Sequence, residues 1–532
     1  MIKKLFLLII LTCTVNAVAQ DQQKQNSNVE LPDFVITGKD VVSVQKAKKI
    51  PPDFISIISE QFVKPVFPPA NLPVKEVQTP IKGSLDLIDS LHFVRGKLAA
   101  EMGSYSLPAA SLIFTNPFSN GLFEAFADAA NRRAYVAGSD QYHLSGGANL
   151  MLFVNNQAGF LPGTQIKFHG NFGTYGYKLF GSDNPQFKRN FNKGDAYISI
   201  NNTLNRYFIF NAEANDRLAS YQNENFSENL FNIFGSVKLS LPNFNLGVNA
   251  NYQKQFITND FYNNGRFYYL YARPYIGLEL SKFMKVSFGF NYAKIDTDFS
   301  FSPYVGFGFY LNKAISIFGE YSTEPEFWSA GHYAGLNPYF RAQKFTNIFV
   351  KKNSAFNVTL KYEYYTYFEI DGGVKYSSSD NFPYFSDAAQ KGMFDINTTD
   401  AKNITGFVNL LFHLGPYGMF YGTAQASDVR DASKNFIPYY PRTKVTLNYG
   451  YNFSFGLNAE ANLQYYSGMY TDILNTKLLN PFFNLGFKLL YQWKPNLGLT
   501  LKFANLLNRK NFIWNGYQDT PLDISAGISL TF

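Results

Sequence analysis

The chain is predicted to be all-β, a transmembrane antiparallel up-and-down β-barrel of about 22 strands within a range of roughly 18–22. Composition supports this fold class, because the 532 residues are 18% aromatic and 16% charged, whereas soluble chains average about 25% charged residues. The mean hydropathy is only −0.17, and no run of about 20 apolar residues follows residue 19. Strands that face lipid and lumen with alternate residues combine these properties.

The first 19 residues have the pattern of a cleaved signal peptide. A basic start is followed by the apolar stretch 5–15 and by Ala17-Val18-Ala19, a small-residue cleavage site that puts the mature start at Gln20. The single cysteine, Cys13, lies within this segment, so the mature chain has no cysteine for a disulfide or a metal site. The mature chain keeps 45 basic and 39 acidic residues, and this mild charge of +6 does not indicate nucleic-acid binding.

Residues 20–91 are predicted to be a proline-rich segment in the periplasm or partly in the lumen. Eight of the 24 prolines lie between Pro32 and Pro80, and a spanning strand does not tolerate that density because proline lacks the backbone donor. The segment is either irregular, with a few anchoring aromatic residues, or contains a short helix capped by Asp53.

Residues 92–532 are predicted to form the barrel, because apolar and polar residues alternate with a period of two. At the end of the chain Ile524, Ile528 and Phe532 share one face, while Ser525 and Ser529 share the other. A helix would break this phase within four residues. The same alternation marks 244–252, 284–292 and 445–453.

Short and long connections alternate along this region, as they do in outer-membrane barrels with short periplasmic turns. Tight turns are predicted at 241–243, 281–282, 312–313, 352–354, 415–416 and 494–496. Longer loops are predicted near 217–227, 254–265, 324–344, 378–392, 428–442, 468–480 and 508–522. An even number of strands with both ends of the barrel in the periplasm follows from this pattern.

Four motifs in the last two hundred residues resemble TonB-dependent outer-membrane receptors. Gly335–Phe340 resembles the family's N-P-x-L segment, and Tyr439–Arg442 resembles its P-x-R-P-R-H strand entry. Asn505–Phe512 is similar to N-L-F-N-K-K-Y, and Gly516-Tyr517 stands where the family has G-Y-P before the last strand. The resemblance implies an integral protein of a Gram-negative outer membrane that works as a transport or receptor channel for an unidentified solute.

The sequence departs from this family before the barrel. The family carries a plug domain of well over a hundred residues, whereas only about 72 residues precede the first predicted strand here, and they are predicted to lack a plug. Phe34-Val35-Ile36-Thr37-Gly38 resembles the stretch that, in the family, lies near the strand pairing with TonB by β-addition. The segment either contacts TonB or is a plain extended periplasmic stretch, and a separate plug or lipoprotein partner stays open.

The final strand also fits the signal that outer-membrane barrels present to the barrel-assembly machinery. That signal has a polar residue, a glycine, an apolar residue and a terminal aromatic residue, here Ser525, Gly527, Leu530 and Phe532. The machinery and outer-membrane lipid are therefore predicted partners. The alternative is that these residues only form the last strand, and both interpretations agree on the fold.

One long loop is rich in aromatic residues and is a candidate ligand site. Its members, around His332, are Phe327, Trp328, Tyr333, Tyr339 and Phe340. Their rings could stack on sugars or other ligand rings, or could pack against one another across the mouth. On the polar strand face, six lysines (Lys238, Lys285, Lys361, Lys444, Lys488 and Lys502) outnumber Glu363 and Glu460. They would favour anions mildly, unless they pair with acidic residues.

No motif predicts an enzyme, a metal site or a cofactor. His143 and Ser145 resemble the H-x-S-N-G stretch of outer-membrane phospholipases, but the asparagine is missing. The five histidines show no H-E-x-x-H spacing, and Asp296 and Asp298 fit a polar turn better than a calcium site. The alternative to transport is an outer-membrane scaffold for adhesion or for a secretion complex. An empty barrel of this size would be a wide hole, so the N-terminal segment, inward loops or a partner should occlude it.

Overall fold

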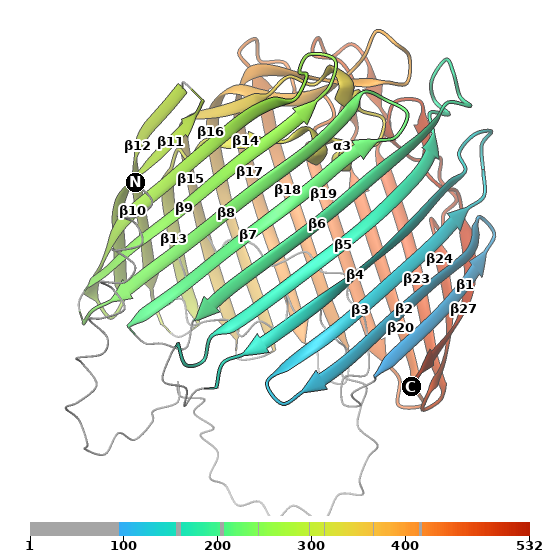
Figure 1. Ribbon diagram of the computed structural model, residues 1–532, viewed down its shortest axis with the longest axis horizontal. Helices are drawn as coiled ribbons and strands as arrows, with labels where there is room; N and C mark the ends of the chain where they lie inside the picture. Colours follow the sequence, from blue (N-terminus) through green and yellow to red (C-terminus); the bar gives the residue numbers. More distant parts are fainter. Residues whose placement is uncertain are drawn as a thin grey trace, which may run out of the picture. The chain divides into compact units, whose positions relative to one another are not determined.

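The computed structural model describes residues 95–155, 161–202, 207–242, 244–296, 298–312, 314–364, 367–413 and 418–532. Within these ranges, 22 antiparallel strands form a closed barrel (Figure 1), which confirms the predicted fold class and strand number. β1 (Gly96–Gly103) pairs with β2 (Ser106–Phe118) and with the last strand, β27 (Asp523–Thr531), and so closes the ring. The segment predicted for 20–91 lies outside the described residues.

The other strands of the wall follow one another around the ring, each paired with its neighbours in the chain. They are β3 (Gly121–Arg132), β4 (Gln141–Phe153), β5 (Gln165–Lys178), β6 (Lys188–Asn202), β7 (Phe208–Tyr221), β8 (Phe226–Ser240), β9 (Phe244–Thr258), β10 (Gly265–Ser281), β11 (Met284–Ile295), β12 (Asp298–Tyr310), β13 (Ile315–Ser322), β15 (Ile348–Tyr364), β16 (Phe368–Asp387), β17 (Phe394–His413), β18 (Met419–Asp431), β19 (Thr443–Asn452), β20 (Leu457–Tyr466), β23 (Phe482–Lys494) and β24 (Leu497–Ala504).

The remaining elements lie in the long loops. They are β14 (Glu326–Trp328), which pairs with the start of β15, the helix α3 (Ala330–Leu336), the 3-10 helix η3 (Ala342–Lys344), and the short hairpins β21 (Met469–Tyr470) with β22 (Leu478–Leu479) and β25 (Phe512–Trp514) with β26 (Tyr517–Gln518). No described helix is long and apolar enough to cross a membrane.

The predicted alternation of the strands is that of lipid-facing and lumen-facing side chains. On β9, Leu246 and Val248 face outward and are 41% and 47% exposed. Asn249, the residue after Val248, faces the lumen and is buried. On β27, Ile528 is 50% exposed and Ser529 is buried. An outward apolar face with every strand edge paired is the condition for crossing hydrocarbon, where an unpaired backbone group costs several kcal/mol.

The turn expected at 352–354 is wrong. β15 runs through these residues as one strand, with a bulge between Lys352 and Ser354, and the chain turns only after Tyr364. The loop expected at 378–392 is also wrong over 378–387, which belong to β16. The predicted number of strands is nevertheless right, because the expected turn divides β15 into two strands while β16 was not predicted as a separate strand. The turn expected at 415–416 lies outside the described residues.

Both errors have one physical cause, namely that these strands extend beyond the membrane. β15, β16 and β17 have 17, 20 and 20 residues, whereas about 9–11 residues suffice to span the hydrocarbon. The protruding part needs no apolar outward face, so its sequence looks like a polar turn. Lys352 even finds an ion-pair partner there, Glu326 on the neighbouring β14.

The C-terminal residue completes the closing seam of the barrel. The Gly96 N–H donates to the Phe532 carbonyl at 2.8 Å, and the Phe532 N–H donates to the Gly96 carbonyl at 2.9 Å. Leu530 and Phe532 face outward, at 41% and 61% exposure, while Ser525 is buried and donates to the Glu101 carboxylate at 2.6 Å. Recognition of these residues by the assembly machinery stays a prediction.

Deletion of Phe532 should reduce the amount of folded barrel in the outer membrane. The deletion removes two seam hydrogen bonds and the aromatic terminus of the proposed assembly signal. The measurement is the fraction of heat-modifiable protein on gels of outer-membrane preparations. Substitution of Trp493, an outward aromatic residue near a turn, by phenylalanine is the matched control. An undiminished fraction after the deletion would contradict the prediction.

Candidate functional site

Long loops from nearly opposite sides of the barrel meet across its mouth. The loop 179–187 joins β5 to β6 and the loop 388–393 joins β16 to β17, with ten wall strands between them one way round and twelve the other. A Cβ placed on Gly392 would lie 2.5 Å from the Gly181 carbonyl oxygen, and one placed on Gly181 would lie 2.7 Å from that of Gly516. Three loops therefore touch backbone to backbone, and we call this junction the roof.

Aromatic side chains fix the roof around the glycine junction. The rings of Tyr339 and Tyr517 stack with centroids 3.3 Å apart, and the Phe180 ring meets the Tyr517 ring edge-on at 4.9 Å. The Tyr517 hydroxyl donates to the Gly392 carbonyl at 2.6 Å, and the Tyr135 hydroxyl donates to the Gln518 carbonyl at 2.7 Å. Edge-to-face and stacked pairs each add about 0.5–1.5 kcal/mol beyond burial, so the loops hold one arrangement.

A buried arginine fastens the loop 323–347 to the barrel wall. Arg189 on β6 is 1% exposed, and its Nε and Nη2 atoms donate to the two carboxylate oxygens of Glu224 at 2.5 and 2.8 Å. Its Nη1 atom donates to the backbone carbonyls of Pro338 and Phe340 at 2.8 and 3.0 Å. Bidentate guanidinium–carboxylate pairs of this kind are strong and geometrically specific, and this one leaves guanidinium hydrogens for the loop backbone.

A buried carboxylate holds the same loop from a second side. Glu228 on β8 accepts from the backbone N–H groups of Ala330 and Gly331 at 3.0 and 2.6 Å, at the start of α3, and from the Gln255 amide at 2.5 Å. These two N–H groups have no partner within the helix. The Asn259 amide donates to the Phe345 carbonyl at 2.8 Å. The loop is therefore anchored to β6, to β8 and to the residue that follows β9.

The five aromatic residues predicted as ligand contacts are brought to the mouth, where they pack largely on one another. Tyr333 and Phe340 are 5% and 1% exposed within a buried cluster. Tyr339 lies in the roof, and the Phe327 ring stacks on Tyr269 at 6.3 Å. Most of these five rings therefore pack against other aromatic rings at the mouth, which was the alternative to ligand binding. Trp328 and Tyr333 also line a cavity, so their contact with a ligand stays a prediction.

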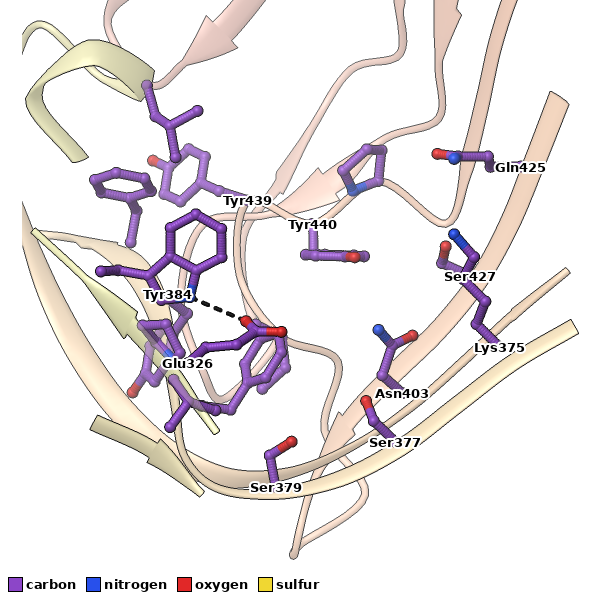
Figure 2. A pocket seen from close by; sticks show the side chains of 18 of the residues that line it. Glu326, Lys375, Ser377, Ser379, Tyr384, Asn403, Gln425, Ser427, Tyr439 and Tyr440 are labelled. Carbon is purple, nitrogen blue, oxygen red and sulfur yellow. Dashed lines mark hydrogen bonds between the residues drawn. The ribbon is translucent and has the colours of Figure 1, made fainter. Parts of the chain in front are cut away.

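That cavity has a volume of about 1000 Å³ and lies between the barrel wall and the inward loops. We call it the chamber. One side is polar and the opposite side is aromatic, as Figure 2 shows. The polar side consists of Lys375, Ser377 and Ser379 on β16, Asn403 on β17 and Gln425 and Ser427 on β18. The aromatic side includes Trp328, Tyr384, Tyr439, Tyr440 and Trp514.

Two chamber residues, Tyr439 and Tyr440, were not anticipated as site residues, although their motif carried part of the family resemblance. Tyr439 has a left-handed backbone, φ 55°, which a bulky residue rarely adopts and which is common at functional sites. Its hydroxyl donates to the Asp387 carboxylate, and its ring lies 5.0 Å from that of Trp514. Burial, and then the hydrogen bond to Asp387 and the charge of that carboxylate, raise the pKa of Tyr439 well above its ordinary value. A Tyr-Tyr-Pro run within a long loop was the available signal.

The chamber is lined by equal numbers of acidic and basic side chains. Three are glutamates (Glu320, Glu324 and Glu326) and three are lysines (Lys352, Lys375 and Lys444). The Lys352 Nζ lies 2.5 Å from Glu326 Oε1, and the Trp328 indole N–H donates to Oε2 at 3.0 Å. Arg273, behind the lining, donates to Glu320 at 3.2 Å. The chamber therefore carries no net charge from its lining.

Four of the six lumen lysines pair with acidic groups, as the alternative to an anion-favouring lumen supposed. The Nζ of Lys361 lies 3.1 Å from Glu369, that of Lys488 lies 3.4 Å from Glu460, and that of Lys285 lies 2.6 Å from Glu279. Lys502 pairs with Glu101. Anion selectivity therefore receives no support from the lumen of the described barrel.

The phospholipase-like pair does not form a nucleophile–base arrangement. Ser145 donates to one oxygen of Asp128, and the His143 ring nitrogen Nε2 lies 2.6 Å from the other. The carboxylate thus stands between serine and histidine, whereas a hydrolase needs histidine between them. Among the described residues, no three His, Cys, Asp or Glu side chains gather as metal ligands, and Asp296 and Asp298 belong to no such group.

Acidification should loosen the loop 323–347. Burial, together with the positive charges of Arg217 and Lys193, lowers the pKa of His332 below its usual value of 6.5. The released loop then binds a proton more readily than the packed loop, so packing loses stability as the pH falls below about 6.5. Protection factors of the α3 amides, which divide the intrinsic exchange rate at each pH by the observed rate, should be lower at about pH 5.5 than at about pH 7.5. His332→Gln should abolish that difference, and an equal response of the variant would contradict the assignment.

Neither a protein-family model nor a curated protein sequence matches the chain. Several solved structures share its fold. The FrpB iron transporter from Neisseria meningitidis has a TM-score of 0.61 at 12% identity, covering 83% of this chain and 82% of that one. The copper transporter OprC has 0.60 at 11%, covering 82% and 80%. A mutant of the ferric enterobactin receptor PfeA from Pseudomonas aeruginosa has 0.59 at 11%, also covering 82% and 80%.

These similarities agree with the resemblance carried by the four C-terminal motifs. They concern the barrel, since residues 1–94 lie outside the described residues. The missing plug and a TonB contact at Phe34–Gly38 therefore stay predictions. The described residues form an outer-membrane type of β-barrel with the fold of the TonB-dependent receptors.

Proposed function

We propose that the protein is an outer-membrane transport or receptor channel that captures a solute in the chamber between its wall and its inward loops. The observation that carries this proposal is the chamber itself, a cavity of about 1000 Å³ enclosed by lumen-facing strand residues and inward loops. That volume is at the upper end for a small-molecule site. The solved structures of the same fold are named as receptors or transporters of iron, copper and siderophores, which supports transport without naming this solute.

The roof favours a gated channel and argues against a permanently open pore. A barrel of 22 strands encloses a lumen wide enough to need a plug, and inward loops were one of three expected ways to close it. Here the loops 179–187, 388–393 and 505–522 touch across the mouth, and the loop 323–347 is clamped beside them. Solute entry therefore requires these loops to move, and binding energy in the chamber is the natural source for that movement.

Single-channel recordings in planar bilayers test the channel. The full chain should show small or rare openings, and replacement of residues 324–346 by a short glycine linker should give large, stable openings. A variant lacking residues 20–91 reports whether that segment also obstructs the lumen. Absence of conductance in all three proteins would refute the channel.

The same preparation distinguishes the scaffold alternative. Affinity purification in mild detergent should recover the barrel without a stoichiometric partner over its loops. A stoichiometric partner there, combined with no conductance, would favour a scaffold in an adhesion or secretion complex. Deletion of Phe34–Gly38 should stop solute uptake by cells without changing solute binding if TonB engages this stretch.

A further inference from the structure

We propose that the chamber binds a neutral, hydroxyl-rich ring compound, an oligosaccharide. This inference rests on the proposed function, since it names the solute class of the same site. It follows from the division of the chamber into a side of hydrogen-bonding groups, most of them neutral, and a side of aromatic rings (Figure 2), together with the balance of its charges.

The neutral groups form a patch on three adjacent strands, and two lysines border it, Lys375 opposite Thr405 and Lys444 opposite Gln425. Asn403 on β17 lies opposite Ser377 on β16, and Thr405 lies opposite Ser427 on β18. The hydroxyls of Thr405 and Ser427 lie 2.9 Å apart, and Gln425 extends the patch by one lumen-facing position. Amides and hydroxyls both donate and accept hydrogen bonds. A surface of such groups matches sugar hydroxyls, which also do both.

The aromatic side supplies flat apolar surfaces across from this patch. Tyr440 is 37% exposed, although it belongs to a loop that folds inward. Its neighbour Tyr439 is held in a left-handed backbone, by the Asp387 carboxylate and by the rings of Trp514 and Phe394. The Tyr440 ring itself meets the Phe382 ring edge-on, with centroids 6.4 Å apart. Sugar rings present apolar C–H faces, and rigid aromatic rings bind such faces with little entropic cost.

The charges of the lining sum to zero, which favours a neutral ligand over a strongly charged one. Three lysines and three glutamates line the chamber, and the Lys352–Glu326 pair ties one of each together. An anionic chelate would gain no net attraction, and a free metal ion would find no group of three acidic, histidine or cysteine side chains among the described residues. The solute class therefore differs from the metals and siderophores in the names of the structural neighbours.

The positions of the three tryptophans give a direct assay of chamber occupancy. Trp328 and Trp514 line the chamber, whereas Trp493 is 57% exposed on the outside of β23. The variant Trp493→Phe of the full chain therefore reports emission from the chamber alone. We expect a saturable change of this emission with at least one neutral tetrasaccharide from a panel of malto-, cello-, laminari-, xylo- and chito-oligomers. Tetragalacturonate, an acidic oligomer, and ferric citrate should produce no change.

Variants then locate the site. Tyr440→Ala removes an aromatic face and Asn403→Ala removes an amide, and each should weaken tetrasaccharide binding about tenfold. The matched control is Asn462→Ala, which removes a strand asparagine of β20 that does not line the chamber and should leave the affinity unchanged. Heat-modifiable mobility on gels shows that each variant barrel is folded.

The outcomes separate this inference from the proposed function. No response to any neutral oligomer, or a response to tetragalacturonate or ferric citrate that Tyr440→Ala weakens, overturns the oligosaccharide assignment. Tetrasaccharide binding in a protein that never conducts overturns the channel and leaves the binding site. Equal losses in Asn403→Ala and Asn462→Ala would show that binding lies outside the chamber.

Discussion

Replacement of Arg189 by methionine should release the loop 323–347 from the barrel wall. The side chain is buried and donates four hydrogen bonds, two to Glu224 and two to loop carbonyls. Its removal leaves a carboxylate and two carbonyls without their donor. Breaking a buried ion pair by removing one partner costs about 3–5 kcal/mol, which is enough to change the preferred state of a single loop. We expect faster proteolysis within 323–347 and longer channel openings, while the barrel itself stays heat-modifiable.

The matched control for this substitution is Arg430→Met. Two guanidinium nitrogens of Arg430 likewise donate to the two carboxylate oxygens of Asp428, but both side chains are exposed. Exposed pairs contribute about 0–1 kcal/mol, so proteolysis and conductance should match those of the original protein. If Arg189→Met behaves like Arg430→Met, the arginine does not anchor the loop.

Replacement of Gly392 by valine should open the roof without touching the chamber. Gly392 has φ +72°, which side chains rarely adopt, and a Cβ there would lie 2.5 Å from the Gly181 carbonyl oxygen. The obstacle is backbone and not the end of a flexible side chain, so one loop must move away from the other. Such a separation also lengthens the hydrogen bond from the Tyr517 hydroxyl to the Gly392 carbonyl. We expect a higher leak of small solutes into proteoliposomes that contain the variant.

Gly335→Ala provides the comparison for the roof. Gly335 lies in α3, in the inward loop 323–347, and a Cβ there meets no atom within 4 Å. Alanine is favoured over glycine within a helix by roughly 0.5–1 kcal/mol, so the leak should not rise. Equal leak in Gly392→Val and the original protein would show that the three-loop junction does not close the mouth.

Much of the barrel was predictable because membrane strands obey a local rule. Within the membrane each strand must alternate apolar and polar residues, so 244–252 and 523–532 revealed their strands and the faces that they turn to lipid. The rule fails where lipid ends. In β15 and β16 the polar positions around Lys352 and Ser378 looked like a turn and a loop, but pairing with neighbouring strands kept them extended.

The chamber was only partly predictable for a related reason. The loop around Trp328 and Tyr333 was recognisable by its aromatic content, and both residues line the cavity. Tyr440 and Gln425 were not, because the residues that face them come from other loops and strands. A tyrosine in a loop has no alternation that fixes its direction, and its place depends on contacts such as those between Tyr439 and Asp387.

The sequence by itself determined a membrane β-barrel of about 22 strands, because hydrocarbon requires every strand to be paired and its outward residues to be apolar, which leaves the alternation that marks each strand. Tertiary structure alone decided that the mouth is roofed and that the inward loops and the barrel wall enclose a chamber whose lining charges balance. Those features depend on Gly181, Gly392 and Gly516 meeting from three loops and on Arg189 reaching the loop 323–347. Their sequence separation exceeds a hundred residues, and only closure of the ring brings them together.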